Sequence, residues 1–241
     1  MAITRNKLEK NLQKIRDNIA EACSRSGRSA AEVRIVAITK TVDLEAIKCL
    51  LDVGLVDLGE NRIQQLQDRA EKLSAYLPRR RNPLPSPVRW HMVGHLQRNK
   101  VKAAVRIAEV IHSVDSLRLA EDLNARAEQA DKTLDVMLQV NCSQELQKSG
   151  CAVGAAGHLG EMVSSLKRLR LIGLMTMAPL VEDPELARPS FVRLRELFEE
   201  MRAEGVGGDD FLNLSMGMSQ DYTIAVEEGA TTLRIGTALF A

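Results

Sequence analysis

Short apolar, β-branched runs alternate with amphipathic helical stretches along the whole sequence, and this alternation limits the possible folds most. Eight strand-like runs can be counted, with seven helical stretches between them. Apolar strands joined by amphipathic helices are typical of parallel βαβ units. Eight such units in 241 residues favour a closed barrel over an open doubly wound sheet, because a (β/α)8 barrel takes about 250 residues. The predicted strands are 33–38, 56–58, 89–93, 110–113, 134–140, 170–175, 211–214 and 232–235.

The first segment is predicted to be an amphipathic helix that Gly27 can end. Its apolar side chains recur at steps of four, three and four, namely Leu8, Leu12, Ile15 and Ile19. Because the sequence stops at Ala241, soon after the last strand-like run, we expect no helix after that strand. We therefore expect an α/β fold, a single (β/α)8 TIM-type barrel with an additional N-terminal helix that fills the gap in the outer ring. One domain, 1–241, covers the whole alternation.

Composition and charge exclude several classes of protein. Lys and Arg total 33 and Asp and Glu total 32, so the basic excess of a nucleic-acid-binding domain is absent. The segment 78–87 holds four prolines and three arginines and is predicted to be an exposed loop, although its arginines could also contact nucleic acid. No apolar window is long enough for a membrane span, and no secretory signal is evident, so we expect a cytoplasmic protein. The four cysteines form no CxxC pair and are expected to be free thiols.

Polar and glycine residues come after the apolar strands, at the end where a βα barrel binds its ligands. The last two strands lead into Ser-x-Gly-x-Ser at 215–219 and Arg-x-Gly-Thr at 234–237. Hydroxyl groups and closely approaching backbone N–H groups suit an anion, and this part of a barrel is a frequent phosphate site. The sequence therefore indicates a phosphorylated ligand. The alternative is that Gly217 and Gly236 only shape turns.

Lys40 comes directly after the first predicted strand. A lysine held in the barrel mouth is partly desolvated, which favours the neutral amine that a Schiff base requires. Alternatively, the side chain only carries a charge from the strand end to solvent. Together with the phosphate cradle on the last two strands, Lys40 indicates pyridoxal 5′-phosphate as the ligand.

At this point several stretches become recognisable: AITKT, LGENR, WHMVGHLQRNK, QKSG, GLMTM, LSMGMSQD and RIGTALF. They extend over nearly the whole chain and resemble, in the same order, those of the pyridoxal phosphate homeostasis protein family (the YggS/PROSC type). That family is a single barrel related to the N-terminal domain of bacterial alanine racemases. The resemblance implies a carrier or buffer of pyridoxal phosphate, for vitamin B6 homeostasis, without robust catalysis.

The resemblance also implies roles for individual residues. Lys40 looks like the lysine that forms the internal aldimine, and Arg234 looks like the residue that faces the pyridine nitrogen. Two further residues, Asn61 and His95, lie on motifs that border the cofactor ring. The implied phosphate cradle is Ser215, Gly217, Gly236 and Thr237.

The implied site chemistry argues against an efficient enzyme. A guanidinium is always protonated, so Arg234 leaves the pyridine nitrogen unprotonated and the ring a poor electron sink. Racemisation also needs a second base, and the only tyrosines are Tyr76 and Tyr222. We expect Tyr222 to pack on the following helix. A metal site at His91 and His95 is disfavoured, because the stretch looks like a strand end and not a helix.

Two other functions stay open at this stage: a pyridoxal phosphate-dependent amino-acid racemase or lyase, and a barrel that binds a phosphorylated sugar or nucleotide. The expected partners are the cofactor and, through the resemblance, apo-enzymes that need it as clients. We expect a monomer, because no long apolar stripe lacks a predicted partner. A membrane partner is not expected.

Overall fold

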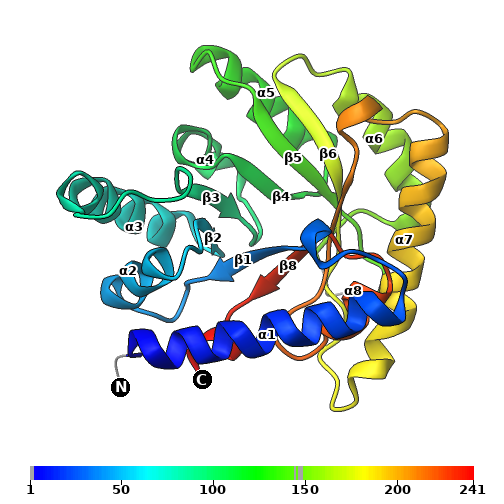
Figure 1. The fold of residues 1–241 in the computed structure, drawn as a ribbon. Helices are drawn as coiled ribbons and strands as arrows, with labels where there is room; N and C mark the ends of the chain where they lie inside the picture. Colours follow the sequence, from blue (N-terminus) through cyan, green and yellow to red (C-terminus); the bar gives the residue numbers. More distant parts are fainter. Residues whose placement is uncertain (1–2, 144, 146–148) are drawn as a thin grey trace.

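The eight predicted strands close into a parallel barrel in the computed structural model (Figure 1), which describes residues 3–143, 145 and 149–241. Neighbouring strands pair in chain order, and β8 returns to pair with β1 through Val36 and Arg234. The predicted barrel is confirmed. The strands are β1 Arg34–Ile38, β2 Asp57–Glu60, β3 Arg89–Met92, β4 Val110–Val114, β5 Leu134–Gln139, β6 Leu169–Met175, β7 Asn213–Ser215 and β8 Thr232–Ile235.

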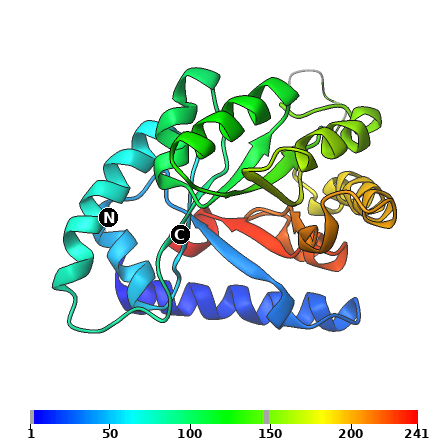
Figure 2. The same cartoon turned by 90° about the horizontal axis from the view of Figure 1, so that it is seen from above.

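Helices surround the strands, as the view from above shows (Figure 2). Their apolar faces bury against the barrel, and their starts obey ordinary capping chemistry: the Asp43 carboxylate accepts a hydrogen bond of 2.9 Å from the N–H of Ala46. The helices are α1 Arg5–Arg25, α2 Leu44–Asp52, α3 Ile63–Tyr76, α4 Val101–Ile107, α5 Leu117–Gln129, α6 Ala156–Ser164, α7 Arg188–Ala203, α8 Tyr222–Glu227 and α9 Thr237–Phe240. Short 3₁₀ turns lie at 30–32, 77–79, 98–100, 153–155, 184–187 and 208–210.

The N-terminal helix completes the outer ring as expected. The predicted apolar stripe of α1 is buried, and the helix contacts α2, α8 and α9. One expectation was wrong: the four-residue helix α9 does come after β8, because the last residues of the chain suffice for a single turn. The Asn11 amide donates to the carbonyls of Leu239 and Ala241 at 2.9 and 3.0 Å, so α1 is fastened to the C-terminal end, which lies beside it in Figure 1.

The interior of the barrel is separate from the main core. The main apolar core fills the space between strands and helices, whereas two small clusters occupy other positions on the strands: Val36, Ile38 and Val93, and Val110, Met137, Ile172 and Met175. Alternate residues of a barrel strand point inward. Buried polar side chains from β3, β4, β7 and β8 share this space, namely His91, His112, Ser215 and Arg234.

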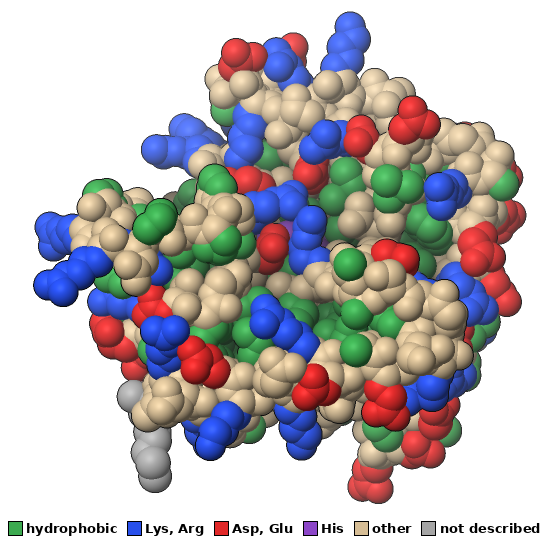
Figure 3. All heavy atoms as spheres, viewed as in Figure 1, with side chains coloured by type: hydrophobic (Ala, Val, Ile, Leu, Met, Phe, Trp, Pro, Cys, Tyr) green, Lys and Arg blue, Asp and Glu red, His purple; other side chains and the backbone are tan. Residues whose placement is uncertain are grey.

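The surface is mixed in charge. Figure 3 shows Lys and Arg side chains close to Asp and Glu over one whole face of the molecule. The segment 78–87 is an irregular, mostly exposed loop after the short turn at 77–79, which confirms the prediction. Within the described residues, no helix has the length and apolar character needed to cross a membrane.

Candidate functional site

A cavity of about 850 Å³ opens at the C-terminal ends of the strands. The segments after β1, β2, β3, β5, β6, β7 and β8 build its walls, so the loops at this end of the barrel converge on one space. The lining residues are Ile38, Lys40, Thr41, Asn61, Arg62, Val93, Gly94, His95, Gln139, Ser149, Met177, Leu180, Met218, Ser219, Gln220, Arg234, Gly236, Thr237 and Ala238. This is the end of the barrel at which the sequence predicts a ligand.

The lining of this cavity is positively charged. Lys40, Arg62 and Arg234 contribute cationic side chains, and among the described residues no aspartate or glutamate lines the cavity. Arg62 and Lys40 are exposed at the rim, whereas Arg234 is only 4% exposed. Cations without carboxylate partners raise the local concentration of anions, most strongly where the walls exclude water. The cavity is therefore suited to an anionic ligand.

Six of the eight predicted site residues line this cavity: Lys40, Asn61, His95, Arg234, Gly236 and Thr237. The other two lie elsewhere. Ser215 is fully buried within β7. Gly217 has a φ of +90°, and a Cβ atom there would lie 2.6 Å from the Cβ of Ala225, so its contacts are with α8. Neither residue forms part of the cavity wall.

Ser219 takes the place in the wall that the sequence analysis gave to Ser215. Its hydroxyl oxygen accepts hydrogen bonds from the backbone N–H groups of Gly236 at 3.3 Å and Ala238 at 3.1 Å. The turn between β8 and α9 thus points two N–H groups at one oxygen atom. The signal was present in the same motif: Ser219 lies four residues beyond Ser215, past the end of β7, where the loops of a barrel form its mouth.

Gly94 allows the loops after β2 and β3 to meet in the cavity wall. A Cβ atom at this position would lie 2.2 Å from the carbonyl oxygen of Asn61, which no side chain tolerates. Asn61 and Gly94 both line the cavity. The glycine of the WHMVGHLQRNK motif is therefore required by a close approach of backbone, and it brings Asn61 beside His95.

The loop that carries Lys40 is held by a buried ion pair. Glu60 is fully buried at the end of β2, where its carboxylate accepts hydrogen bonds from Thr39 and from Arg69 of α3. The Arg69 guanidinium also donates to the carbonyl of Val42 at 2.8 Å, on the far side of Lys40. Residues 39–42 are thus fixed at both ends. The Lys40 side chain itself is exposed, so the expectation that it is desolvated was wrong: it reaches past the strand end into the open mouth.

Arg234 is the deepest cation of the site. Its Nη1 donates to Ser215 Oγ at 2.7 Å and its Nη2 donates to the carbonyl of Thr176 at 2.7 Å. These two bonds use only part of its five N–H groups. Burial lowers the pKa of Arg234 to about 10, and the charge of Asp221 offsets this effect only in part. The guanidinium remains protonated at neutral pH and has donor capacity left for a ligand.

The two tyrosines and His91 lie away from the cavity. Tyr222 is buried as expected, but as the first residue of α8 and against α1, where its hydroxyl oxygen accepts from Asn18 at 2.6 Å, and not on the following helix. Tyr76 lies under Lys48, whose Nζ is 4.6 Å from the centre of the Tyr76 ring. His91 is buried in the barrel whereas His95 is exposed beside Asp115, and no cluster of three metal-ligating side chains occurs in the described chain.

All four cysteines are free, as expected: Cys23, Cys49, Cys142 and Cys151. Burial raises the pKa of Cys142 and of Cys151 to about 11, so both are protonated at neutral pH. Lys148 of the QKSG stretch lies outside the described residues.

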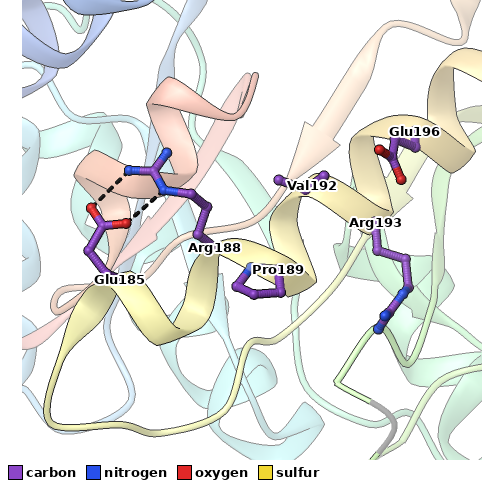
Figure 4. A pocket seen from close by; sticks show the side chains of 6 residues that line it. All are labelled: Glu185, Arg188, Pro189, Val192, Arg193 and Glu196. Carbon is purple, nitrogen blue, oxygen red and sulfur yellow. Dashed lines mark hydrogen bonds and ion pairs between the residues drawn. The ribbon is translucent and has the colours of Figure 1, made fainter.

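A second, shallower hollow lies on the outside of α7 (Figure 4). Its volume is about 390 Å³, and Arg188, Pro189 and Val192 contribute to its wall. Arg188 turns toward Glu185, and the two side chains form paired hydrogen bonds of 2.7 and 2.8 Å. Because this hollow carries two arginines and two glutamates, Arg188, Arg193, Glu185 and Glu196, it lacks the uncompensated positive charge of the cavity in the barrel mouth.

Comparison with known proteins adds an independent observation. Residues 10–241 match the family described as the alanine racemase N-terminal domain. A pyridoxal phosphate homeostasis protein of Aquifex aeolicus is 37% identical over 229 residues, with 95% of each chain covered. A protein of unknown function from Bifidobacterium adolescentis has a crystal structure similar to this fold, with a TM-score of 0.91 and 34% identity over 100% of this chain and 98% of that one. PipY of Synechococcus elongatus, solved with PLP bound, gives a TM-score of 0.78 at 31% identity, covering 92% of this chain and 100% of that one.

Proposed function

The chain belongs to the family of pyridoxal phosphate homeostasis proteins, and on this premise we propose that it binds pyridoxal 5′-phosphate in the mouth of the barrel, attached covalently through Lys40. The observation that carries the proposal is the cavity whose wall holds Lys40, Arg62 and Arg234 and, within the described residues, no carboxylate. Pyridoxal phosphate is an anion with an aldehyde, so it needs cations and one accessible primary amine. Its binding serves storage and delivery of the cofactor.

The residues present fit this ligand. The N–H groups of Gly236 and Ala238 already converge on a hydroxyl oxygen, which is the arrangement that a phosphate oxygen needs, and Thr237 adds a side-chain hydroxyl. Arg234 can only donate, so it suits an unprotonated ring nitrogen at the base of the cavity. Asn61 and His95 border the same space. When bound, pyridoxal phosphate supplies an aldehyde that condenses with a primary amine.

The chain's own residues argue for binding without robust turnover. Arg234 holds the ring nitrogen as an acceptor, which leaves the ring without the positive charge that stabilises a carbanion. Neither tyrosine of the chain lines the cavity, so neither can act there as a second base. The curated relatives are named as homeostasis proteins and not as enzymes, in agreement with the predicted absence of catalysis.

Several further parts of the proposal concern the protein as a whole. We take residues 1–241 to act as one pyridoxal phosphate-binding domain, in a monomeric protein of the cytoplasm. Apo-enzymes that require pyridoxal phosphate are the proposed clients. Transfer of bound cofactor to such an apo-enzyme, and a single-chain mass by light scattering, are the corresponding measurements.

The direct test is the absorption spectrum of the purified protein with pyridoxal 5′-phosphate, and then borohydride reduction and peptide mapping by mass spectrometry. We expect a yellow protein with the reduced pyridoxyl group on Lys40, its loss in Lys40→Ala, and its retention in Lys72→Ala, an exposed lysine on α3. A label on another lysine would contradict the attachment. Absence of any chromophore would contradict the ligand and favour another phosphorylated compound. Loss of a substrate's α-proton in deuterium oxide would instead indicate a racemase.

A further inference from the structure

A continuous chain of buried hydrogen bonds leads from Arg234 through the interior of the barrel to Asp57 at the start of β2. Arg234 Nη1 contacts Ser215 Oγ at 2.7 Å, and Ser215 Oγ contacts His112 Nδ1 at 2.9 Å. His112 Nε2 contacts His91 Nδ1 at 2.9 Å, and His91 Nε2 contacts Asp57 Oδ1 at 2.8 Å. Strands β2, β3, β4, β7 and β8 supply the links between the cavity and the opposite end of the barrel.

The two ends of this chain fix its direction. Arg234 can only donate, so Ser215 Oγ accepts from it and its own proton is free for His112 Nδ1. An ionised Asp57 can only accept, so His91 Nε2 carries a proton and His91 Nδ1 is an acceptor. His112 Nε2 must then carry a proton and donate it to the hydrogen bond with His91 Nδ1. Both histidines are therefore neutral with the proton on Nε2, and every link has one donor and one acceptor.

The surroundings of the chain agree with this assignment. Burial lowers the pKa of His91, and burial lowers the pKa of His112 further, which keeps both rings neutral. Although burial opposes it, the hydrogen bond from His91, together with the charges of Arg34 and Arg89, lowers the pKa of Asp57, so the carboxylate stays ionised. His112 contacts His91 and Ser215 and feels the charges of Arg234, Arg89 and Arg34.

We propose that Ser215, His112, His91 and Asp57 are positioning residues, which hold Arg234 in place from behind. Their donors and acceptors satisfy one another, so the cavity side of the guanidinium is left free. The chain orients Arg234 toward whatever acceptor lies in the cavity. The identity of that acceptor, the ring nitrogen of pyridoxal phosphate, rests on the proposed function above.

The first experiment tests the chain without any ligand. Long-range ¹⁵N–¹H correlation spectra of the full-length protein at neutral pH report which ring nitrogen of each histidine carries the proton. We expect His91 and His112 both to be neutral with protonated Nε2 and bare Nδ1. A protonated Nδ1 in either ring, or a doubly protonated ring, would reverse a link and overturn the proposal.

The second experiment tests the effect on Arg234 with two probes, pyridoxal 5′-phosphate and its N-methylpyridinium derivative, which lacks the acceptor on the ring nitrogen. The ratio of their dissociation constants isolates the bond to Arg234, because aldehyde and phosphate are common to both. We expect the unaltered protein to prefer pyridoxal 5′-phosphate by about tenfold or more. In Ser215→Ala this preference is expected to fall severalfold.

Ser113→Ala is the matched control, since Ser113 is an equally buried serine on β4 whose Oγ has no hydrogen-bond partner among the described residues. Ser113→Ala should prefer pyridoxal 5′-phosphate over the N-methylpyridinium derivative by the same factor as the unaltered protein. If Ser215→Ala weakens both probes equally, Ser215 acts on the phosphate or on the fold alone, and an unchanged ratio likewise overturns the proposal. If neither probe binds the unaltered protein, the proposed function fails, whereas the proton positions still decide whether the chain exists.

Discussion

Two arginines of this protein, the half-buried Arg188 and the buried Arg234, have opposite surroundings. Arg188, on the outer face of α7, binds three carboxylates directly, at 2.6 to 2.7 Å from Glu185, Glu227 and Glu228 (Figure 4 shows the first of these). Arg234, inside the barrel, contacts a hydroxyl and a carbonyl. Hydrogen bonds that Arg188 donates to Glu185 and Glu227 raise the pKa of Arg188, whereas burial lowers the pKa of Arg234.

The difference shows how a cation is kept available for a ligand. Carboxylates that touch a guanidinium occupy its donors and leave it little to offer, as at Arg188. At Arg234 both contacts are with neutral groups, and Asp57 lies behind three neutral side chains at the far end of the hydrogen-bond chain, so part of the donor set stays open toward the cavity. The ion pairs of Arg188 join α7 to the C-terminal end of α8, whereas the contacts of Arg234 leave it able to bind a ligand in the cavity.

The largest effect is expected from breaking the hydrogen-bond chain between Arg234 and Asp57 at its central residue, His112. His112→Leu leaves the Ser215 hydroxyl proton buried without an acceptor and His91 Nδ1 buried without a donor, and each such group costs about 1–3 kcal/mol. We expect the free energy of unfolding to fall by roughly 2–5 kcal/mol in urea denaturation. His158→Leu, at a largely exposed position, should leave it unchanged. A loss below about 1 kcal/mol for His112→Leu would show that the inner links contribute little.

A smaller effect is expected at the far end of the chain. Asp57→Asn keeps an oxygen that can accept from His91 but removes the negative charge beside His91, Arg34 and Arg89, at a cost of about 1–3 kcal/mol in urea denaturation. The affinity for pyridoxal 5′-phosphate should fall as well, because the guanidinium loses its support. Asp68→Asn, on the exposed face of α3, is the control. Equal effects of the two variants would contradict the role of Asp57 in positioning Arg234 through the hydrogen-bond chain.

The inner histidines should also make stability depend on pH. Because the pKa values of His91 and His112 are lowered in the folded state, the unfolded chain takes up protons first as the pH falls below about 6.5. Stability is complete above that pH and is lost as the pH falls toward the folded-state pKa values, at up to about 1.4 kcal/mol per pH unit for each histidine. Chemical denaturation over this window should give a shallower slope in His112→Leu. An identical slope in both proteins would show that His112 does not titrate on unfolding.

The smallest effect is expected in the outer cluster. Glu227→Gln removes one of the three carboxylates at Arg188 and the partner of Arg25, yet Glu185 and Glu228 remain. Partly exposed ion pairs contribute up to about 1 kcal/mol, so the variant should lose no more than that in urea denaturation. Its affinity for pyridoxal 5′-phosphate should be unchanged. A larger loss of stability than in Asp57→Asn would reverse the contrast between the two arginines.

Local sequence patterns predicted the barrel and most of the cavity wall, because both depend on strand periodicity and on the residue types just beyond each strand. Lys40 and Gly236 lie where a barrel brings strand ends together, so their convergence could be predicted. The exposure of Lys40 could not, since it depends on how far the loop held by Arg69 stands away from the strand.

The hydrogen-bond chain from Arg234 to Asp57 could not be predicted from the sequence, for a different reason. Asp57, His91 and His112 belong to three strands, and their contacts depend on the register of each pairing, such as Gly59 with His91 and His91 with Val110. A shift of one residue would turn each side chain to the opposite face of the barrel. The direction of the Ser215 side chain also depends on strand register. The sequence predicts Ser215 in the phosphate cradle, whereas in the structure its hydroxyl contacts His112 inside the barrel.

The fastening of α1 to the last residues of the chain affects the order of events during synthesis. The β1–β8 pairing and the bonds from Asn11 join segments separated by nearly the whole chain. Contacts of such long sequence separation form late, because a large loop must close before they give any stability. On the ribosome, α1 emerges long before α8 and α9, two of the helices that cover its apolar stripe. Helix α1 is thus made early and is among the last elements to reach its place.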